Sequence, residues 1–141
     1  MRRYLVVAHQ TLGSPELRDA MLERLSAGPS TFHLLVPQRQ AGGSLSWTEG
    51  ERRAVAEEAL EAARMDFTAR GFAVTGEVGD LNAAYAVSDV LIREGTDAFD
   101  EIIISTLPLG MSKWVHLDVP ARVARATERP VTHVVAVHAS A

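Results

Sequence analysis

The sequence contains no cysteine, and this absence excludes several kinds of site. Without thiols there is no disulfide framework, no thiolate metal ligand and no thiol nucleophile. Positive charge is not in excess either, because the 141 residues carry a formal net charge of -4 at pH 7 and the arginines are scattered rather than clustered. Binding to nucleic acid or to an anionic membrane is therefore not expected.

Long hydrophobic runs are also missing. The opening MRRYLVVAHQ has two arginines followed by only five apolar or aromatic residues, which is too short for a signal-peptide core or a membrane span. We therefore expect a cytoplasmic protein without membrane contact. With 47% hydrophobic and 23% charged residues, the chain is long enough for one domain with a real core and too short for two, so residues 1–141 are predicted to form a single domain.

Four short apolar runs predict β-strands, at residues 4–8, 32–36, 102–104 and 131–137. They are rich in leucine or β-branched residues and nearly continuous, which is typical of strands that helices cover on both faces. A weaker run at residues 72–78 alternates apolar with small or polar residues. It predicts an edge strand.

Helical patterns with their own start signals lie between these strands. Ser14 precedes a proline and a glutamate, and Thr48 precedes Glu51 by three residues as in a capping box. Two more helices are expected at about residues 82–94 and 118–127. Alternating strands and helices predict an α/β fold with a five-stranded, mostly parallel, doubly wound sheet and helices on both faces.

In such sheets ligands bind outside the carboxyl ends of the strands. His9 and Thr11 follow the first strand, Val36 ends the second, and Ser105 and Thr106 follow the fourth. We expect these residues to border a crevice.

The loop STLPLGMSKWVHLDVP, residues 105–120, is expected to cross the mouth of that crevice. It contains one glycine, Gly110, where a phosphate cradle usually needs several. Asp118 stands directly before the expected fourth helix, so it is predicted to cap that helix with its carboxylate.

At these residues the chain resembles the universal stress proteins. The resemblance rests on the element order, on YLVVAHQT, on VGDLNAAYAV and above all on DEIIISTLPLGMSKWVHLDVPARVARATERPVTHVV. It implies the sheet order 3-2-1-4-5, adenine-nucleotide binding in some members, and a homodimer. The expected contact is the last strand, from Val131 to Val137, which would be an edge without proline or lysine.

The phosphate loop of the nucleotide-binding members, Gly-x2-Gly-x9-Gly-[Ser/Thr], is not preserved in this chain. Ser105 and Pro108 align with its first two glycines, and Asp118 falls within the final pair. Proline has no N–H to donate and fixes its own φ. A carboxylate ~4 Å from a phosphate would cost about 4 kcal/mol at an effective dielectric of ~20. The interpretation is a loop that has lost its phosphate chemistry, with no cofactor expected.

Three functions follow from these observations. The first is a non-enzymatic, homodimeric binding or regulatory module that meets a protein partner. The second retains ATP, AMP or another small ligand in the crevice, held by Thr11, Val36, Ser105, Thr106 and Gly110. Whether Lys113 or Arg122 restores phosphate binding is left open by the sequence. The third is a small hydrolase that uses His9, Ser105 and His116. No metal site and no catalytic residue are assigned, and the ligand-binding candidates are His9, Thr11, Val36, Ser105, Thr106, Gly110 and Asp118.

Overall fold

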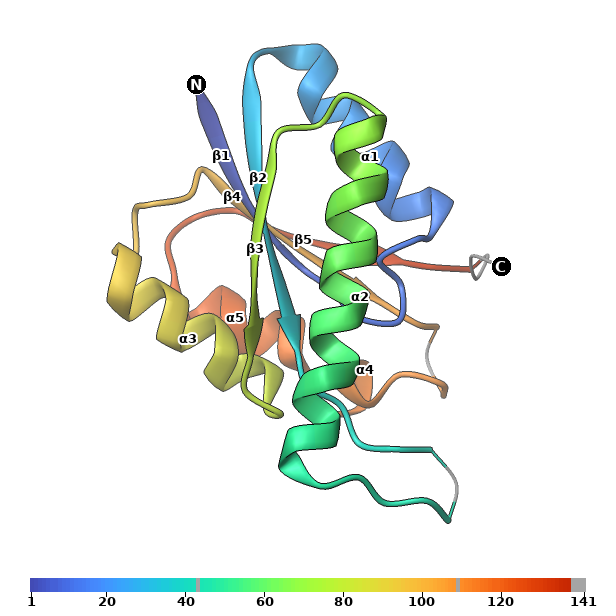
Figure 1. The fold of residues 1–141 in the computed structure, drawn as a ribbon. Helices are drawn as coiled ribbons and strands as arrows, with labels where there is room; N and C mark the ends of the chain where they lie inside the picture. Colours follow the sequence, from blue (N-terminus) through green and yellow to red (C-terminus); the bar gives the residue numbers. More distant parts are fainter. Residues whose placement is uncertain (43, 109, 138–141) are drawn as a thin grey trace.

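The computed structural model describes residues 1–42, 44–108 and 110–137, with the backbone alone at Lys113 and His116. The elements follow one another as strands and helices in alternation (Figure 1), with one short extra helix before the last long one. Their bounds are β1 Arg2–Val7, α1 Pro15–Ala27, β2 Ser30–Pro37, α2 Glu49–Ala69, β3 Val74–Gly79, α3 Ala83–Glu94, β4 Glu101–Thr106, α4 Lys113–His116, α5 Val119–Ala126 and β5 Val131–Val135.

The five strands form one sheet in the order β3-β2-β1-β4-β5, and all four pairings are parallel. The predicted fold class and strand order are therefore confirmed. In the centre, Val7 of β1 pairs with Leu35 of β2 on one side and with Ile104 of β4 on the other. From β1 the chain adds β2 and β3 on one side and then crosses back to add β4 and β5 on the other, so the strand order switches between β1 and β4.

Helices cover both faces of this sheet, which explains the nearly continuous apolar strands. On β1, Tyr4 and Val6 belong to the core beneath α1 and α2, while Leu5 and Val7 belong to the core beneath α3 and α5. Figure 1 shows the two helix pairs on opposite sides of the sheet. Both predicted start signals are present, because Ser14 accepts a hydrogen bond from Leu17 N and Thr48 forms its capping box with Glu51.

Two glycines let helices approach the edge strand β3 closely. Gly76 and Gly79 stand three positions apart, so they face opposite sides of the sheet. A Cβ on Gly76 would overlap Leu60 of α2, and a Cβ on Gly79 would lie 2.7 Å from the Cβ of Ala86 on α3. The packing of α2 and α3 against this edge strand therefore requires glycine, which has no side chain, at both positions.

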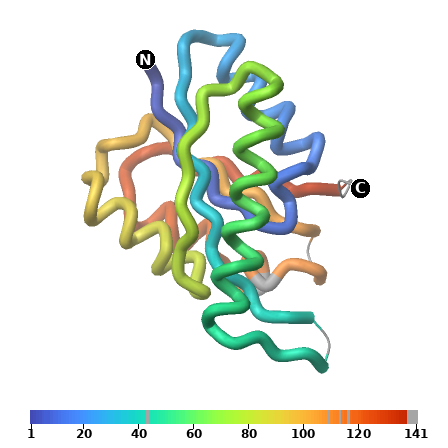
Figure 2. The backbone as a smooth tube through the Cα atoms, viewed as in Figure 1, coloured from blue at the N-terminus to red at the C-terminus, as the bar shows by residue number. Residues whose placement is uncertain are grey.

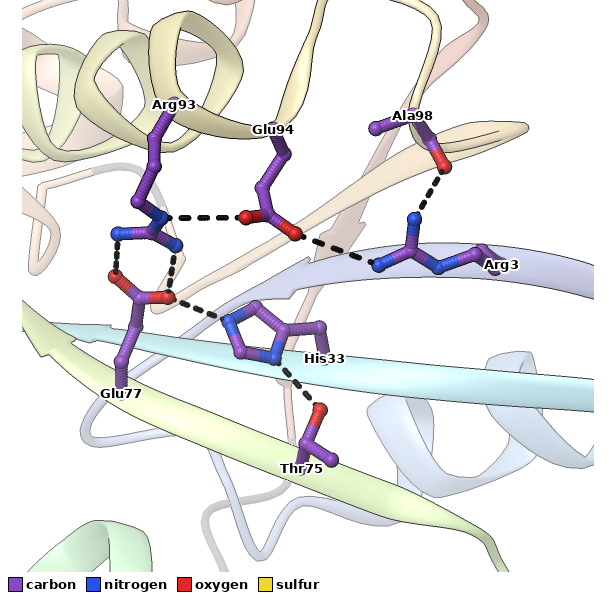
Figure 3. Close-up of polar contacts among 7 residues, drawn as sticks. All are labelled: Arg3, His33, Thr75, Glu77, Arg93, Glu94 and Ala98. Carbon is purple, nitrogen blue, oxygen red and sulfur yellow. Dashed lines mark hydrogen bonds and ion pairs between the residues drawn. The ribbon is translucent and has the colours of Figure 1, made fainter.

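A polar network also ties α3 to the sheet (Figure 3). Arg93 binds Glu77 of β3 with both Nη atoms, at 3.0 and 2.5 Å, and Glu94 lies 3.7 Å from the guanidinium of Arg3 on β1. His33 of β2 joins the network through Nε2, which lies 2.7 Å from Glu77 Oε2. This histidine is thus held by structural contacts on the face that α3 covers.

The connection between β2 and α2 extends beyond the carboxyl ends of the strands (Figure 2). Its part next to β2, residues 38–42, borders the cleft described below. In the part of the chain that the structure describes, no helix combines the length and apolarity needed to cross a membrane.

Candidate functional site

A cleft of about 860 Å³ lies at the carboxyl ends of the strands. It opens beside the switch in strand order, the place where α/β sheets usually bind ligands. Its lining comes from residues 9–11, 38–42, 80–85 and 105–107, and from Met111, Ser112, Trp114, Leu117, Val119 and Arg122.

Buried hydroxyl groups border the cleft where β1 and β4 end. Thr11 Oγ1 lies 2.7 Å from Ser105 Oγ, and Thr106 Oγ1 lies 2.7 Å from His133 Nε2 on β5. Burial lowers the pKa of His133. Between Thr11 and Ser105 one hydroxyl donates its hydrogen to the other. The hydrogen of the accepting hydroxyl is therefore available to an acceptor on a ligand.

His9 borders the cleft directly after β1 and is only 7% exposed. Its Nδ1 lies 2.8 Å from the carbonyl oxygen of Pro37. A carbonyl can only accept, so Nδ1 carries the hydrogen and Nε2 of the neutral ring is an acceptor. Burial lowers the pKa of His9; the bond to Pro37 acts in the opposite direction, and Arg39 lowers the pKa further. The ring is therefore neutral at neutral pH.

Three charged side chains of the described residues line the cleft: Arg39, Asp80 and Arg122. The guanidinium of Arg39 lies 5.0 Å from the ring centre of Trp47 and donates to the carbonyl of Gln40. Asp80 accepts a hydrogen bond from the backbone of its own loop. Two arginines against one aspartate leave a local charge of about +1, which favours an anionic ligand of low charge.

The outer part of the cleft is apolar. Tyr85 on α3 is 65% exposed, Met111 is 69% exposed and Leu117 is 52% exposed. Trp114 on α4 is half-buried, contacts the core beneath α3 and α5, and also lines the cleft. These side chains offer a surface on which a ring system would pack.

The expected helix cap at Asp118 is wrong in one respect. Asp118 does occupy the N-cap position of α5, but its side chain makes no capping hydrogen bond. Its backbone is left-handed, with φ 58° and ψ 41°, whereas a capping side chain needs an extended residue to reach the helix N–H groups. The sequence also missed α4, whose Val115 N donates to Ser112 Oγ.

The structure brings together four of the predicted ligand residues, since His9, Thr11, Ser105 and Thr106 all line the cleft. Val36 is instead fully buried in the core beneath α1 and α2. Gly110, with φ 91°, and Asp118 are in the crossing loop but are not among the described lining residues. The binding roles of all seven remain predictions.

The sequence left open whether the side chain of Lys113 or Arg122 reaches the cleft. Arg122 lines the cleft, whereas the side chain of Lys113 lies outside the described part of the structure. The lining also includes Gln38, Asn82 and Tyr85, which the sequence did not single out. The sequence feature that could have identified them is that they follow the second and third predicted strands, whose carboxyl ends border the cleft.

The residues proposed for a hydrolase do not form a catalytic pair within the described structure. Ser105 is hydrogen-bonded to Thr11 and His9 to Pro37, and no described hydrogen bond joins His9 to Ser105. The side chain of His116 lies outside the described residues. Among those that are described, no three histidine or acidic side chains are grouped as a metal site would require.

No protein-family model and no curated protein matches the sequence. Solved structures do match. A protein of the universal stress protein family from Burkholderia pseudomallei is 18% identical, with a TM-score of 0.60 and 93% of both chains covered. A universal stress protein in complex with cAMP is 17% identical, with a TM-score of 0.61 over 99% of this chain and 98% of that one.

A third structure is a universal stress protein family protein from Arabidopsis thaliana with AMP bound. It is 14% identical, with a TM-score of 0.63 over 96% of this chain and 92% of that one. These likenesses show that the chain has the fold of the universal stress proteins.

Proposed function

We propose that the chain is a single-domain, non-enzymatic binding module that holds a small ligand in its strand-end cleft without the ATP phosphate loop. The main support for this proposal is the cleft, which has a size suited to a small ligand and combines a few polar groups with an apolar rim. His9 and Ser105 each have another hydrogen-bond partner. This arrangement supports recognition rather than catalysis.

Two features of the crossing loop support the loss of ATP chemistry. Pro108 has no backbone N–H to offer a phosphate. Asp118 has the left-handed backbone that favours glycine, it falls within the two positions where the resemblance aligns the final Gly-[Ser/Thr] pair, and it adds a carboxylate there. The left-handed backbone at Asp118 is thus compatible with a loop that once bound phosphate. The missing N–H of Pro108 and the negative charge of Asp118 disfavour binding of a triphosphate.

An adenine nucleotide of low charge is the second candidate. Two structures with this fold contain AMP and cAMP, and a local charge of about +1 from Arg39, Arg122 and Asp80 suits a phosphodiester better than a triphosphate. The apolar rim near Trp114 would accommodate a base.

Calorimetric titration of the protein with ATP, AMP, cAMP and inorganic phosphate tests both candidates. We expect no binding of ATP by the parent and, under the second candidate, binding of cAMP or AMP that weakens about tenfold in Arg122→Gln, which removes one charge contact. Arg125→Gln is the matched control, because Arg125 lies on the same helix but does not line the cleft. Micromolar binding of ATP by the parent would overturn the lost phosphate loop.

A parallel titration of Asp118→Ser with ATP isolates the effect of the carboxylate. Gain of ATP binding in this variant would support Asp118 as the group that opposes a triphosphate. Equal absence of ATP binding in parent and variant would place the loss in Pro108 and the rest of the loop.

We further propose a homodimer through the open edge of β5. Ala136 N donates to Thr106 O and Ile102 N donates to Pro130 O, so the even-numbered residues of this strand bond to β4. The odd-numbered residues, Val135 among them, then present their N–H and C=O groups to the open edge. An unpaired edge of this kind is a template for a second strand.

Light scattering of Val135→Pro tests this interface. Proline removes an outward N–H and should leave the β4 pairing intact, so we expect a monomeric mass beside a dimeric parent. Val135→Thr keeps the N–H and should remain dimeric. A monomeric parent at micromolar concentration would contradict the dimer.

A further inference from the structure

His9 is a buried, titratable side chain on the wall of the cleft. It is the only histidine among the described residues that lines the cleft. Two residues after the end of β1, it stands next to the switch in strand order, where ligands of α/β sheets bind. A polar group at such a position normally contributes to ligand specificity.

The hydrogen bond to Pro37 fixes the chemical character of the ring. Because Nδ1 must donate to the carbonyl, Nε2 keeps a lone pair and no hydrogen in the neutral ring. No other described residue donates a hydrogen bond to Nε2. This atom is also not among the side-chain nitrogen and oxygen atoms that are buried from solvent and lack a hydrogen-bond partner. Within the described residues, Nε2 is therefore an acceptor without a partner, on a side chain that lines the cleft.

The charged groups around the ring keep it in this form. Those that line the same cleft are Arg39 from the segment after β2, Asp80 from the segment before α3 and Arg122 from α5. Arg39 opposes a second positive charge on His9. Asp80 is the lone acid of the described lining, and its Oδ1 accepts from Asn82 N at 2.8 Å. None of these groups supplies a proton to Nε2.

We propose that His9 determines ligand specificity by accepting, through Nε2, a hydrogen bond from a neutral amino or hydroxyl group of the ligand. The ligand class is a ring compound that bears such a donor and at most one negative charge, since it must also fit the apolar rim and the weakly positive cleft. A carbonyl or carboxylate oxygen at this point would be repelled, because its lone pairs would face the lone pair of Nε2. The inference rests on the proposed small-ligand function and names the group by which the ligand is recognised.

Adenosine and cAMP are suitable probes, because neither changes its protonation between about pH 5 and about pH 8, the range in which histidine titrates. In calorimetry at the upper pH we expect His9→Leu to bind at least ~10-fold more weakly than the parent, the cost of one hydrogen bond. His9→Gln should stay within ~3-fold of the parent, because its amide both donates to Pro37 and accepts from the ligand. His33→Gln, which changes a histidine outside the cleft, is the control.

The pH dependence gives a second readout. Acidification protonates Nε2 and removes the acceptor, so binding by the parent should fall as the pH drops through the pKa of His9, which burial holds below the ordinary value of 6.5. The His9→Gln variant should show no such fall. Nitrogen-15 spectra of the ligand-free parent should show the neutral Nδ1–H tautomer at neutral pH, a measurement that does not depend on any variant folding.

The outcomes separate this inference from the function on which it rests. Binding that is unchanged in His9→Leu, a flat pH profile of the parent, or an Nε2–H tautomer would overturn the role of His9 while leaving the cleft as a binding site. Failure of the parent to bind either probe would overturn the nucleotide-like ligand class together with the inference. Loss in His9→Leu with retention in His9→Gln would support it.

Discussion

Arg24 on α1 holds Glu101 on β4 through two parallel hydrogen bonds, from Nε to Oε1 at 2.9 Å and from Nη2 to Oε2 at 2.8 Å. The two side chains are only 17% and 16% exposed. Thr132 of β5 donates to the same carboxylate. Because Glu101 is the first residue of β4, the pair lies at the end of the sheet opposite to the cleft. It joins a helix to two strands without taking part in the candidate site.

Replacing Arg24 by alanine should therefore lower stability and spare binding. The change leaves the largely buried carboxylate of Glu101 without its main partner, so we expect the free energy of unfolding to fall by about 2 kcal/mol. Denaturant unfolding measures this. Arg18→Ala on the same helix is the control and should cost less than about 0.5 kcal/mol; equal losses in the two variants would show that the pair contributes nothing specific.

Acid should destabilise the protein through Glu77 and Glu101. Burial alone would raise the pKa of each, but the hydrogen bonds from Arg93 and His33 to Glu77, and from Arg24 and Thr132 to Glu101, outweigh it and lower both values from the ordinary 4.5. A carboxyl with a lowered folded-state pKa stabilises fully above its unfolded value and loses that contribution as the pH falls through the folded value.

Unfolding measured from about pH 7 down to about pH 3 should accordingly show a loss that begins near the ordinary carboxyl pKa. Glu77→Gln should be less stable at neutral pH and show a shallower slope. The loss from Glu77 should be modest, about 0.5 to 1 kcal/mol, because its partner Arg93 is half exposed and the pair is screened. A slope in Glu77→Gln identical to that of the parent would exclude Glu77 as a contributor.

Gly79→Ala should destabilise the edge of the sheet beneath α3. The new Cβ would lie 2.7 Å from the Cβ of Ala86 and 2.9 Å from Cδ1 of Leu35, so the helix must move away, at a cost of about 1 to 3 kcal/mol. Thermal or denaturant unfolding checks the value. Gly28→Ala is the matched control, since a Cβ added there would have no neighbouring atom within 4 Å, and it should be nearly neutral.

Asp118→Gly should raise stability. The left-handed backbone at Asp118 is unfavourable for residues with a Cβ and natural for glycine, and no capping hydrogen bond is lost. We expect a gain of up to about 1 kcal/mol in the free energy of unfolding, measured by denaturant titration. Asp118→Val should move in the opposite direction, because a branched side chain tolerates this backbone poorly. A destabilised Asp118→Gly would mean that the carboxylate has a stabilising contact.

The predictions that succeeded from sequence depended on short distances along the chain or on repeated patterns. The caps at Ser14 and Thr48 involve residues three positions away, and the strands were marked by their own apolar runs. The cap at Asp118 failed because its backbone angle is set by how the crossing loop joins α4 to α5. Val36 was expected at the crevice but is fully buried in the core beneath α1 and α2.

The sequence by itself determined the order of the strands and of the four longer helices, the two-sided burial of the sheet and the edge at which polar residues gather, because local patterning and chain connectivity suffice for these. Only the tertiary structure decided the chemistry of the cleft. The hydrogen bond that leaves His9 Nε2 open joins residues 28 positions apart, and the Thr11–Ser105 bond joins residues 94 positions apart. Such contacts depend on the register of neighbouring parallel strands, which the packing of the whole core fixes.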